Sequence, residues 1–218
     1  MWCVPKLTEK FIRKMDDVLD IYARDYDPAK PVICLDEKTT QLLSTPRGSV
    51  AAKPGSVKKV DYEYKRNGTA NIFVSIEPQV GKRYLKVTSR RTANDFAEFL
   101  NDLVMKKYQR AEKVILVMDN LNTHRETSLV ARYGEKKAAI INQRIEWHYS
   151  PEHASWLNMA EMEIGKVTKK VLGKRIQTQE HLRQEVAAYE KVQNKLKPTI
   201  NWKFTKEKAY AKFKLSEN

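Results

Sequence analysis

Two short apolar runs, each ending in an aspartate, constrain this chain more than any other feature of its sequence. Residues 31–36 read PVICLD, and residues 113–119 read KVILVMD. Both runs are continuous in hydrophobicity rather than alternating, which is typical of a strand that is buried on both faces of a sheet. The segments between and after them mix strand-like and helical patterns. This mixture predicts an α/β fold in which a central mixed sheet is flanked by helices.

The other elements follow from periodicity and from turn residues. Helical spacing of apolar residues predicts a first helix over residues 8–26, which ends at Asp27-Pro28 because the residue before a proline avoids the helical region. The dipeptide Asn67-Gly68 separates two strand-like segments, so a hairpin with a type I′ turn is predicted over residues 60–77. Further strands are predicted at residues 82–87 and 145–149. One further helix is predicted to begin at residue 92, and another follows residue 119 and extends to about residue 142. Two more helices are predicted at residues 155–172 and 178–195.

The charge of the chain indicates a polyanionic partner. There are 41 lysine and arginine residues against 27 aspartate and glutamate residues, a net charge of +14. Nucleic acid is the commonest partner of such a protein, although a soluble protein that is merely basic has the same composition. The longest clean apolar run, residues 114–118, is far shorter than the roughly 20 residues that span a bilayer. Cys3 and Cys34 form no CxxC pair, which suits a reducing cytoplasm.

The aspartates that end the two apolar runs are candidate metal ligands. A charge at the end of a buried strand is costly unless it is paired or bound to a metal, and the carboxyl ends of strands are where ligands bind in open α/β sheets. The alternative is that Asp36 and Asp119 are turn residues or ion-pair partners. A two-metal site needs a third carboxylate. The helix predicted after residue 149 offers Glu161 and Glu163, and helical periodicity does not choose between them.

The motifs around these carboxylates resemble those of a known family. The runs MDNLNTH at residues 118–124 and YSPEHASWLNMAE at residues 149–161 resemble the bacterial insertion-sequence branch of the mariner superfamily of DDE transposases. In that family the second aspartate lies in a D-N-x-x-x-H segment, and the third acidic residue follows an S/T-P segment and ends an N-x-x-E motif. Asn158 and Glu161 match this motif, and Asp36 in LDEK matches the first aspartate. The resemblance therefore selects Glu161 over Glu163. It extends from about residue 28 to residue 205.

The resemblance implies an RNase H-like fold with a five-stranded sheet. It implies that Asp36, Asp119 and Glu161 are catalytic and hold two Mg²⁺ ions per site, with Mn²⁺ as a substitute and Asp36 shared between the ions. It also implies metal-dependent cleavage of DNA at transposon ends, followed by attack of the freed 3′-hydroxyl on target DNA at TA dinucleotides. The other possibilities are a different RNase H-like nuclease, such as a junction resolvase, and an inactive DNA-binding remnant.

Auxiliary and DNA-binding residues are expected around the carboxylates. Asn120, His124 and Asn158 are candidate auxiliary residues, although His124 is equally suited to cap the following helix. Basic residues on loop 44–59 and along the helix of Glu161 are expected either to contact DNA or to form an ordinary solvated surface. They are Arg47, Lys53, Lys58, Lys59, Lys166, Lys169, Lys170, Lys174 and Arg175. By resemblance, loop 44–59 lies where mariner-type enzymes grip the partner subunit, which implies a homodimer on DNA.

Three regions are expected along the chain. Residues 1–30 are predicted to form a linker helix, residues 31–175 the catalytic domain with loop 44–59, and residues 176–218 a helical extension. Only one helix is predicted before Asp36, whereas a helix-turn-helix reader of transposon ends needs at least two. Such a reader is therefore expected on a separate or upstream segment. The protein is expected to be cytoplasmic and associated with the nucleoid.

Overall fold

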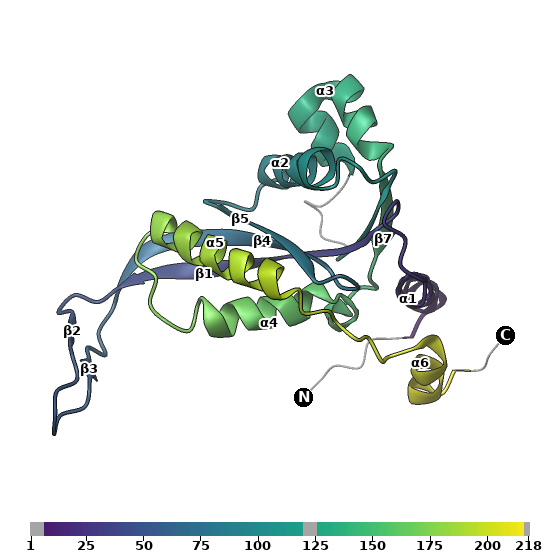
Figure 1. Ribbon diagram of the computed structural model, residues 1–218. Coiled ribbons are helices and arrows are strands. Elements are labelled where there is room, and N and C mark those ends of the chain that lie inside the picture. Colours follow the sequence, from purple (N-terminus) through teal and green to yellow (C-terminus); the bar gives the residue numbers. More distant parts are fainter. Residues whose placement is uncertain (1–6, 120–125, 216–218) are drawn as a thin grey trace.

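A computed structural model describes residues 7–119 and 126–215 of the chain, and a mixed five-stranded sheet lies at its centre (Figure 1). The strand order is β5-β4-β1-β6-β7. Strands β5, β4 and β1 pair antiparallel, whereas β1, β6 and β7 pair parallel. The strands are β1 (Val32–Ser44), β4 (Lys65–Glu77), β5 (Lys82–Thr88), β6 (Val114–Met118) and β7 (Ile145–Tyr149). The sequence prediction of a five-stranded mixed sheet is confirmed.

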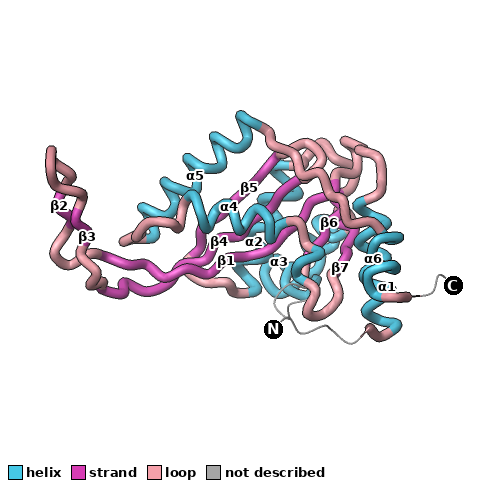
Figure 2. Tube along the Cα trace, turned by 90° about the horizontal axis from the view of Figure 1, so that it is seen from below, coloured by secondary structure: helices cyan, strands magenta, loops and turns pink. Residues whose placement is uncertain are grey.

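Helices cover both faces of this sheet, which is why its strands are apolar on both sides (Figures 1 and 2). Ile33 and Leu35 pack under α2 and α3, whereas Val32 and Cys34 pack against α1 and the start of α4. On the antiparallel half, α4 and α5 cover the face that carries Ile72. The helices are α1 (Glu9–Tyr22), α2 (Ala93–Asp102) with a π-helical turn (Leu103–Lys107), α3 (Glu126–Asn142), α4 (Ala160–Lys170), α5 (Gln179–Leu196) and α6 (Lys206–Phe213).

Two predicted helices are shorter than expected. Helix α1 begins after Thr8, whose hydroxyl accepts a hydrogen bond from the Phe11 N–H, and it ends at Tyr22 rather than at residue 26. The helix expected over residues 155–172 is divided into a 3₁₀ turn, Ser155–Leu157, and α4. Asn158 separates the two parts because its backbone is extended, with φ −80° and ψ 114°.

The predicted hairpin over residues 60–77 is wrong. Asn67 and Gly68 lie inside β4, which pairs along its length with β1 and not with the segment that precedes it. The pairing has a β-bulge between Gln41 and Leu43 of β1, opposite this dipeptide. Gly68 has φ +96°, a conformation that suits glycine at a bulge as well as at a tight turn. The dipeptide therefore indicated an irregular backbone correctly but assigned it the wrong structure.

Residues 45–64 form an arm that continues from β1 and β4 and projects away from the sheet (Figures 1 and 2). Its only regular structure is a short ladder between β2 (Ser49–Val50) and β3 (Lys59–Val60). The arm exposes large apolar side chains, with Val57 81% and Tyr62 82% accessible. The basic loop expected at residues 44–59 is thus extended.

No helix in residues 7–119 or 126–215 combines the length and the apolar character that crossing a membrane requires.

Candidate active site

Asp36 and Asp119 lie on neighbouring strands in the parallel part of the sheet. Strands β1 and β6 run parallel, and Leu35 pairs with Met118, so each aspartate follows a paired residue. Neighbouring strands lie about 4.8 Å apart, and the two aspartates therefore start from adjacent backbone positions. From the sequence both are expected at strand ends. That expectation holds for Asp119, which directly follows β6, but it is wrong for Asp36, because β1 continues to Ser44.

The Asp36 carboxyl group is buried, and the charges of three other carboxylates act on it. Asp36 is 7% exposed, and its Oδ1 accepts a hydrogen bond of 2.7 Å from the Glu37 N–H. The pKa of Asp36 is raised from 3.8 to about 7, chiefly by burial and also by the charges of Asp119, Glu161 and Glu37, although the hydrogen bond from the Glu37 N–H opposes the shift. The charges of both other members of the sequence-predicted triad therefore act on Asp36.

Asn158 ties the start of α4 to the strand that carries Asp36. Its side-chain amide donates a hydrogen bond of 2.8 Å to the Leu35 carbonyl, and its Oδ1 accepts one of 3.1 Å from the Ala160 N–H. Its own carbonyl accepts a hydrogen bond of 3.1 Å from the Glu161 N–H. Asn158 is 1% exposed, so these bonds are shielded from water. The N-x-x-E spacing therefore has a structural reason: the asparagine fixes the first turn of the helix that presents the glutamate.

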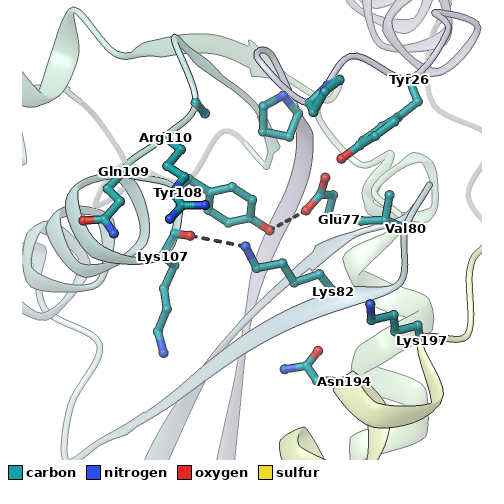
Figure 3. Close-up of a pocket in the computed structure, with 13 residues that line it drawn as sticks. Tyr26, Glu77, Val80, Lys82, Lys107, Tyr108, Gln109, Arg110, Asn194 and Lys197 are labelled. Atoms are coloured by element: carbon teal, nitrogen blue, oxygen red, sulfur yellow. Dashed lines mark hydrogen bonds between the residues drawn. The ribbon is translucent and has the colours of Figure 1, made fainter.

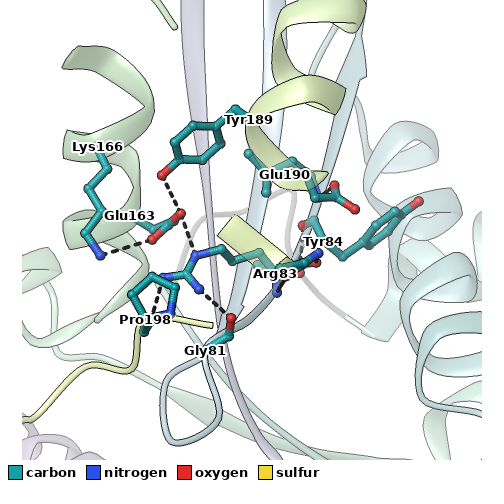
Figure 4. Close-up of polar contacts among 11 residues, drawn as sticks. Gly81, Arg83, Tyr84, Glu163, Lys166, Tyr189, Glu190 and Pro198 are labelled. Atoms are coloured by element: carbon teal, nitrogen blue, oxygen red, sulfur yellow. Dashed lines mark hydrogen bonds and ion pairs between the residues drawn. The ribbon is translucent and has the colours of Figure 1, made fainter. Parts of the chain in front are cut away.

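Glu163 is committed to a buried ion pair (Figure 4). Its Oε1 accepts hydrogen bonds of 2.8 Å from Arg83 Nε and 2.7 Å from the Tyr189 hydroxyl, and both side chains of the ion pair are fully buried. Lys166 Nζ lies 3.5 Å from the other carboxylate oxygen. Arg83 is held further by the carbonyl of Pro198, at 2.9 Å. These contacts give Glu163 a structural role and leave Glu161 as the α4 carboxylate near Asp36.

The donor set of Asp36, Asp119 and Glu161 fits a hard divalent cation. All three supply carboxylate oxygens, the ligands that Mg²⁺ prefers, and Mg²⁺ needs only one or two of them because water and phosphate complete its shell. In the portion of the chain that the structure describes, no three aspartate, glutamate, histidine or cysteine side chains are close enough together to form a metal site. Burial is the main cause of the raised pKa of Asp36, and the charges of Asp119 and Glu161 add to it; a bound cation would offset both effects.

Several predicted DNA-binding residues have partners within the protein. Arg175 donates to the backbone carbonyls of Tyr62 and Glu63 at 3.1 and 2.8 Å, which anchors the base of the arm. Lys174 pairs with Glu185 at 2.7 Å, and Arg47 with Glu63 at 3.5 Å. The arm carries Lys53, Lys58 and Lys59 away from the sheet, and hence away from the three carboxylates (Figure 1).

Lys169 and Lys170 are exposed in the last turn of α4, where cations complement the helix dipole. Asn120 and His124, the other predicted auxiliary residues, lie outside the residues that the structure describes.

One pair of charged residues near the site was not predicted from the sequence. The Glu37 side chain is 4% exposed and pairs with Arg91 at 3.1 Å, which connects β1 to the residue before the cap of α2. Arg91 lies in the segment VTSRRT, residues 87–92, which contributes to the family resemblance. Hydrophobic periodicity does not predict which acidic residue Arg91 pairs with. The structure therefore supplies a contact that the sequence pattern could not reveal.

One family profile covers most of the chain, including all three candidate carboxylates. The profile described as "DDE superfamily endonuclease" matches residues 31–183. The chain belongs to this family. The match starts one residue before β1, ends within α5 and includes Asp36, Asp119 and Glu161. Comparison with curated proteins gives no significant match.

Solved structures of Mos1 transposase complexes share the fold of this DDE family member. The Mos1 strand transfer complex aligns with a TM-score of 0.58 and 14% identity, over 89% of this chain and 60% of that one. A Mos1 paired-end complex with the left transposon end aligns with a TM-score of 0.56 and 14% identity, over 88% and 57%. The mixed sheet is thus RNase H-like, as the resemblance implied, and the chain spans about three fifths of the Mos1 chains.

Proposed function

We propose that this DDE family member is the catalytic part of a transposase in the bacterial insertion-sequence branch of the mariner superfamily. The observation that carries the proposal is the family match over residues 31–183, which contains Asp36, Asp119 and Glu161, together with the charges of Asp119 and Glu161 that act on the buried Asp36 carboxyl group. The motif around Asn158 supports it, because that side chain connects the strand of Asp36 to the helix of Glu161. Asp36, Asp119 and Glu161 are the proposed catalytic residues and metal ligands.

The proposed reaction has two steps at phosphorus. In the first, the oxygen of a water attacks a phosphodiester at the transposon end, the bond from phosphorus to the 3′ oxygen breaks, and a 3′-hydroxyl is released. In the second, the oxygen of that hydroxyl loses its proton and attacks a phosphodiester of target DNA. A bond from phosphorus to this oxygen forms, the bond from phosphorus to the 3′ oxygen of the target strand breaks, and that oxygen takes up a proton to leave as a 3′-hydroxyl. Asp36 would contribute to both of two Mg²⁺ or Mn²⁺ positions, with Asp119 and Glu161 each completing one. Such ions polarise phosphate oxygens and neutralise the charge of the transition state.

The similar structures support the proposed partners. They are paired-end and strand transfer complexes of Mos1, one of them with Mn and another with Mg. We propose that this protein acts on double-stranded DNA as a homodimer, with the arm of residues 45–64 reaching the partner subunit. In this proposal residues 1–30 serve as a linker, residues 31–175 as the catalytic domain and residues 176–218 as a supporting extension. A separate helix-turn-helix segment reads the transposon ends in the cytoplasm.

The experiment combines the protein, pre-cut transposon ends and supercoiled plasmid, with Mg²⁺ or with EDTA. We expect end–plasmid joints in Mg²⁺, none in EDTA, and insertions at TA dinucleotides, whose pyrimidine–purine step is easily deformed. Cleavage of branched junctions without joining would instead identify a resolvase. DNA binding without any cleavage would identify an inactive remnant.

A further inference from the structure

A cavity lined by several basic side chains lies beside the start of β1 and β6 (Figure 3). Its volume is about 740 Å³. It is lined by residues that precede β1 and β6, by the last residue of β4 and by the first residue of β5, among them Pro31, Ala111, Glu77 and Lys82. Asp119 instead follows β6, whose five residues span about 16 Å at roughly 3.3 Å each. The cavity is therefore separate from the candidate active site.

Four cations surround this cavity, and none has an ion-pair partner in the described portion of the chain. They are Lys82, Lys107, Arg110 and Lys197, and all four are exposed. Many other basic residues, such as Lys86 and Lys174, are paired with carboxylates. Burial lowers the pKa of Lys82, the charge of Glu77 opposes this shift, and the smaller effect of the Lys107 charge also lowers the pKa. A bound anion would relieve this crowding of positive charge.

The positions of the cations are set by the fold. Lys82 Nζ donates a hydrogen bond of 3.2 Å to the Lys107 carbonyl and lies 3.9 Å from the centre of the Tyr108 ring. Lys197 ends α5 in a left-handed conformation, with φ +47°. Its carbonyl packs so closely against Gly81 that a Cβ atom there would lie 2.5 Å from it. The cavity is thus part of the folded framework and not a chance gap between flexible side chains.

The floor of the cavity differs in charge from its rim. Glu77 is 3% exposed, and its Oε2 accepts a hydrogen bond of 2.9 Å from the Tyr108 hydroxyl. A small anion that entered deeply would meet this carboxylate, whereas an extended anion crossing the mouth would meet only the exposed cations. Three lysines and an arginine around the cavity suit the phosphates of a DNA backbone, which proteins bind without reading sequence.

We propose that this cavity binds the sugar–phosphate backbone of duplex DNA, as a second DNA contact separate from the carboxylate triad. The inference rests on the proposed function for DNA as the partner. The ligand chemistry is the phosphate ester, and its source is duplex DNA rather than a free nucleotide. Because the cavity is distant from Asp36, Asp119 and Glu161, it holds DNA without taking part in the chemical step.

The test measures duplex binding as a function of salt, in EDTA so that no cleavage occurs. A triple variant, Lys107→Gln, Arg110→Gln and Lys197→Asn, removes three charges from exposed positions, and asparagine tolerates the left-handed backbone at residue 197. The control removes three charges from exposed lysines outside the cavity, by Lys136→Gln, Lys191→Gln and Lys203→Gln. We expect the slope of log K against log salt to fall by about 2 to 3 in the cavity variant, and to change little in the control. Equal slopes in the two variants would overturn the proposal.

Lysine acetylation read by mass spectrometry distinguishes the two sources of phosphate. We expect duplex DNA to protect Lys82, Lys107 and Lys197, and ADP or pyrophosphate at equal phosphate concentration to leave them reactive. The reverse pattern would assign the cavity to a small anion and overturn the proposal. Because neither measurement depends on metal or cleavage, its failure is distinguishable from failure of the proposed transposase activity.

Discussion

The ionised form of the Asp36 carboxyl group lowers the stability of the fold, whereas the proposed metal binding requires that form. In the metal-free protein its folded-state pKa is about 7, well above the ordinary value of 3.8, chiefly because the group is buried. A raised carboxyl pKa stabilises the fold fully below pH 4, and this contribution is lost as pH rises to 7. At neutral pH the ionised Asp36 carboxylate therefore costs stability, which the proposed metal ions would restore by binding only the folded state.

We predict that Asp36→Asn stabilises the metal-free protein at pH 8 by about 2 kcal/mol, discounted from the full shift because the surroundings can relax. The gain in the free energy of unfolding should be small near pH 4, grow up to pH 7 and then level off. The reason is that asparagine, unlike Asp36, has no proton to lose. Urea denaturation in EDTA across this pH range measures it. A difference between the two proteins that does not change with pH would contradict the assigned cause.

At the site, the sequence distinguishes between neighbouring candidate residues only where a family motif constrains them. The motif selected Glu161, whereas periodicity alone left Glu161 and Glu163 equivalent. The structure gives the missing reason, because Glu163 is paired with Arg83. The sequence contains one sign of this pairing. Arg83, Leu85 and Val87 occupy every second position of β5, so the Arg83 side chain lies on the same buried face as the two apolar ones. A charge at such a position needs a buried partner, but the sequence does not say which.

At the scale of elements, the pair of Arg83 and Glu163 joins β5 to α4, and Tyr189 adds α5. Removing one partner leaves a buried charge, whereas removing both leaves an apolar contact. We predict that Arg83→Met destabilises the fold by about 3–5 kcal/mol and that adding Glu163→Met recovers at least half of the loss. Chemical denaturation of the single and double variants measures this. Equal losses in both would show that the two charges do not depend on each other.

The arm of residues 45–64 is a second element with a testable role. Its exposed Val57 and Tyr62 have no core to cover, which suits a contact with another protein surface. We predict that Val57→Ser combined with Tyr62→Ser leaves thermal stability unchanged and reduces the fraction of DNA complexes that contain two protomers. Light scattering of the complexes measures this fraction. An unchanged fraction of complexes with two protomers would show that the arm is not part of the dimer interface.

Elements were predicted well where one short segment determines them and less well where partners are distant in sequence. The buried strand of residues 114–118 and the capped helix after Thr92 follow from local patterns. The hairpin was mispredicted because the pairing of β4 depends on the extension of β1 to Ser44, far away in the sequence. The pattern around Asp36 gave no sign of this extension, because residues 37–44 are mostly polar.

At the scale of the whole molecule, the excess of 14 positive charges would dominate the proposed association with DNA. Neutralised phosphates release condensed counterions, and affinity then falls steeply with salt. We predict that duplex affinity falls at least a hundredfold between about 50 and 200 mM salt, for random as well as for defined sequences. Fluorescence anisotropy measures it. A nearly constant affinity over this range would show that the positive charge serves another purpose.

The central claim is that Asp36, Asp119 and Glu161 hold the divalent ions, and Mn²⁺ binding to purified variants tests it most directly. We predict that Asp36→Asn, Asp119→Asn and Glu161→Gln each weaken Mn²⁺ binding at least tenfold in calorimetric or electron paramagnetic resonance titrations, while their circular dichroism stays that of the wild type. Glu163→Gln, the matched control two residues away, should bind within twofold of the wild type. Loss of binding in Glu163→Gln with retention in Glu161→Gln would contradict the account.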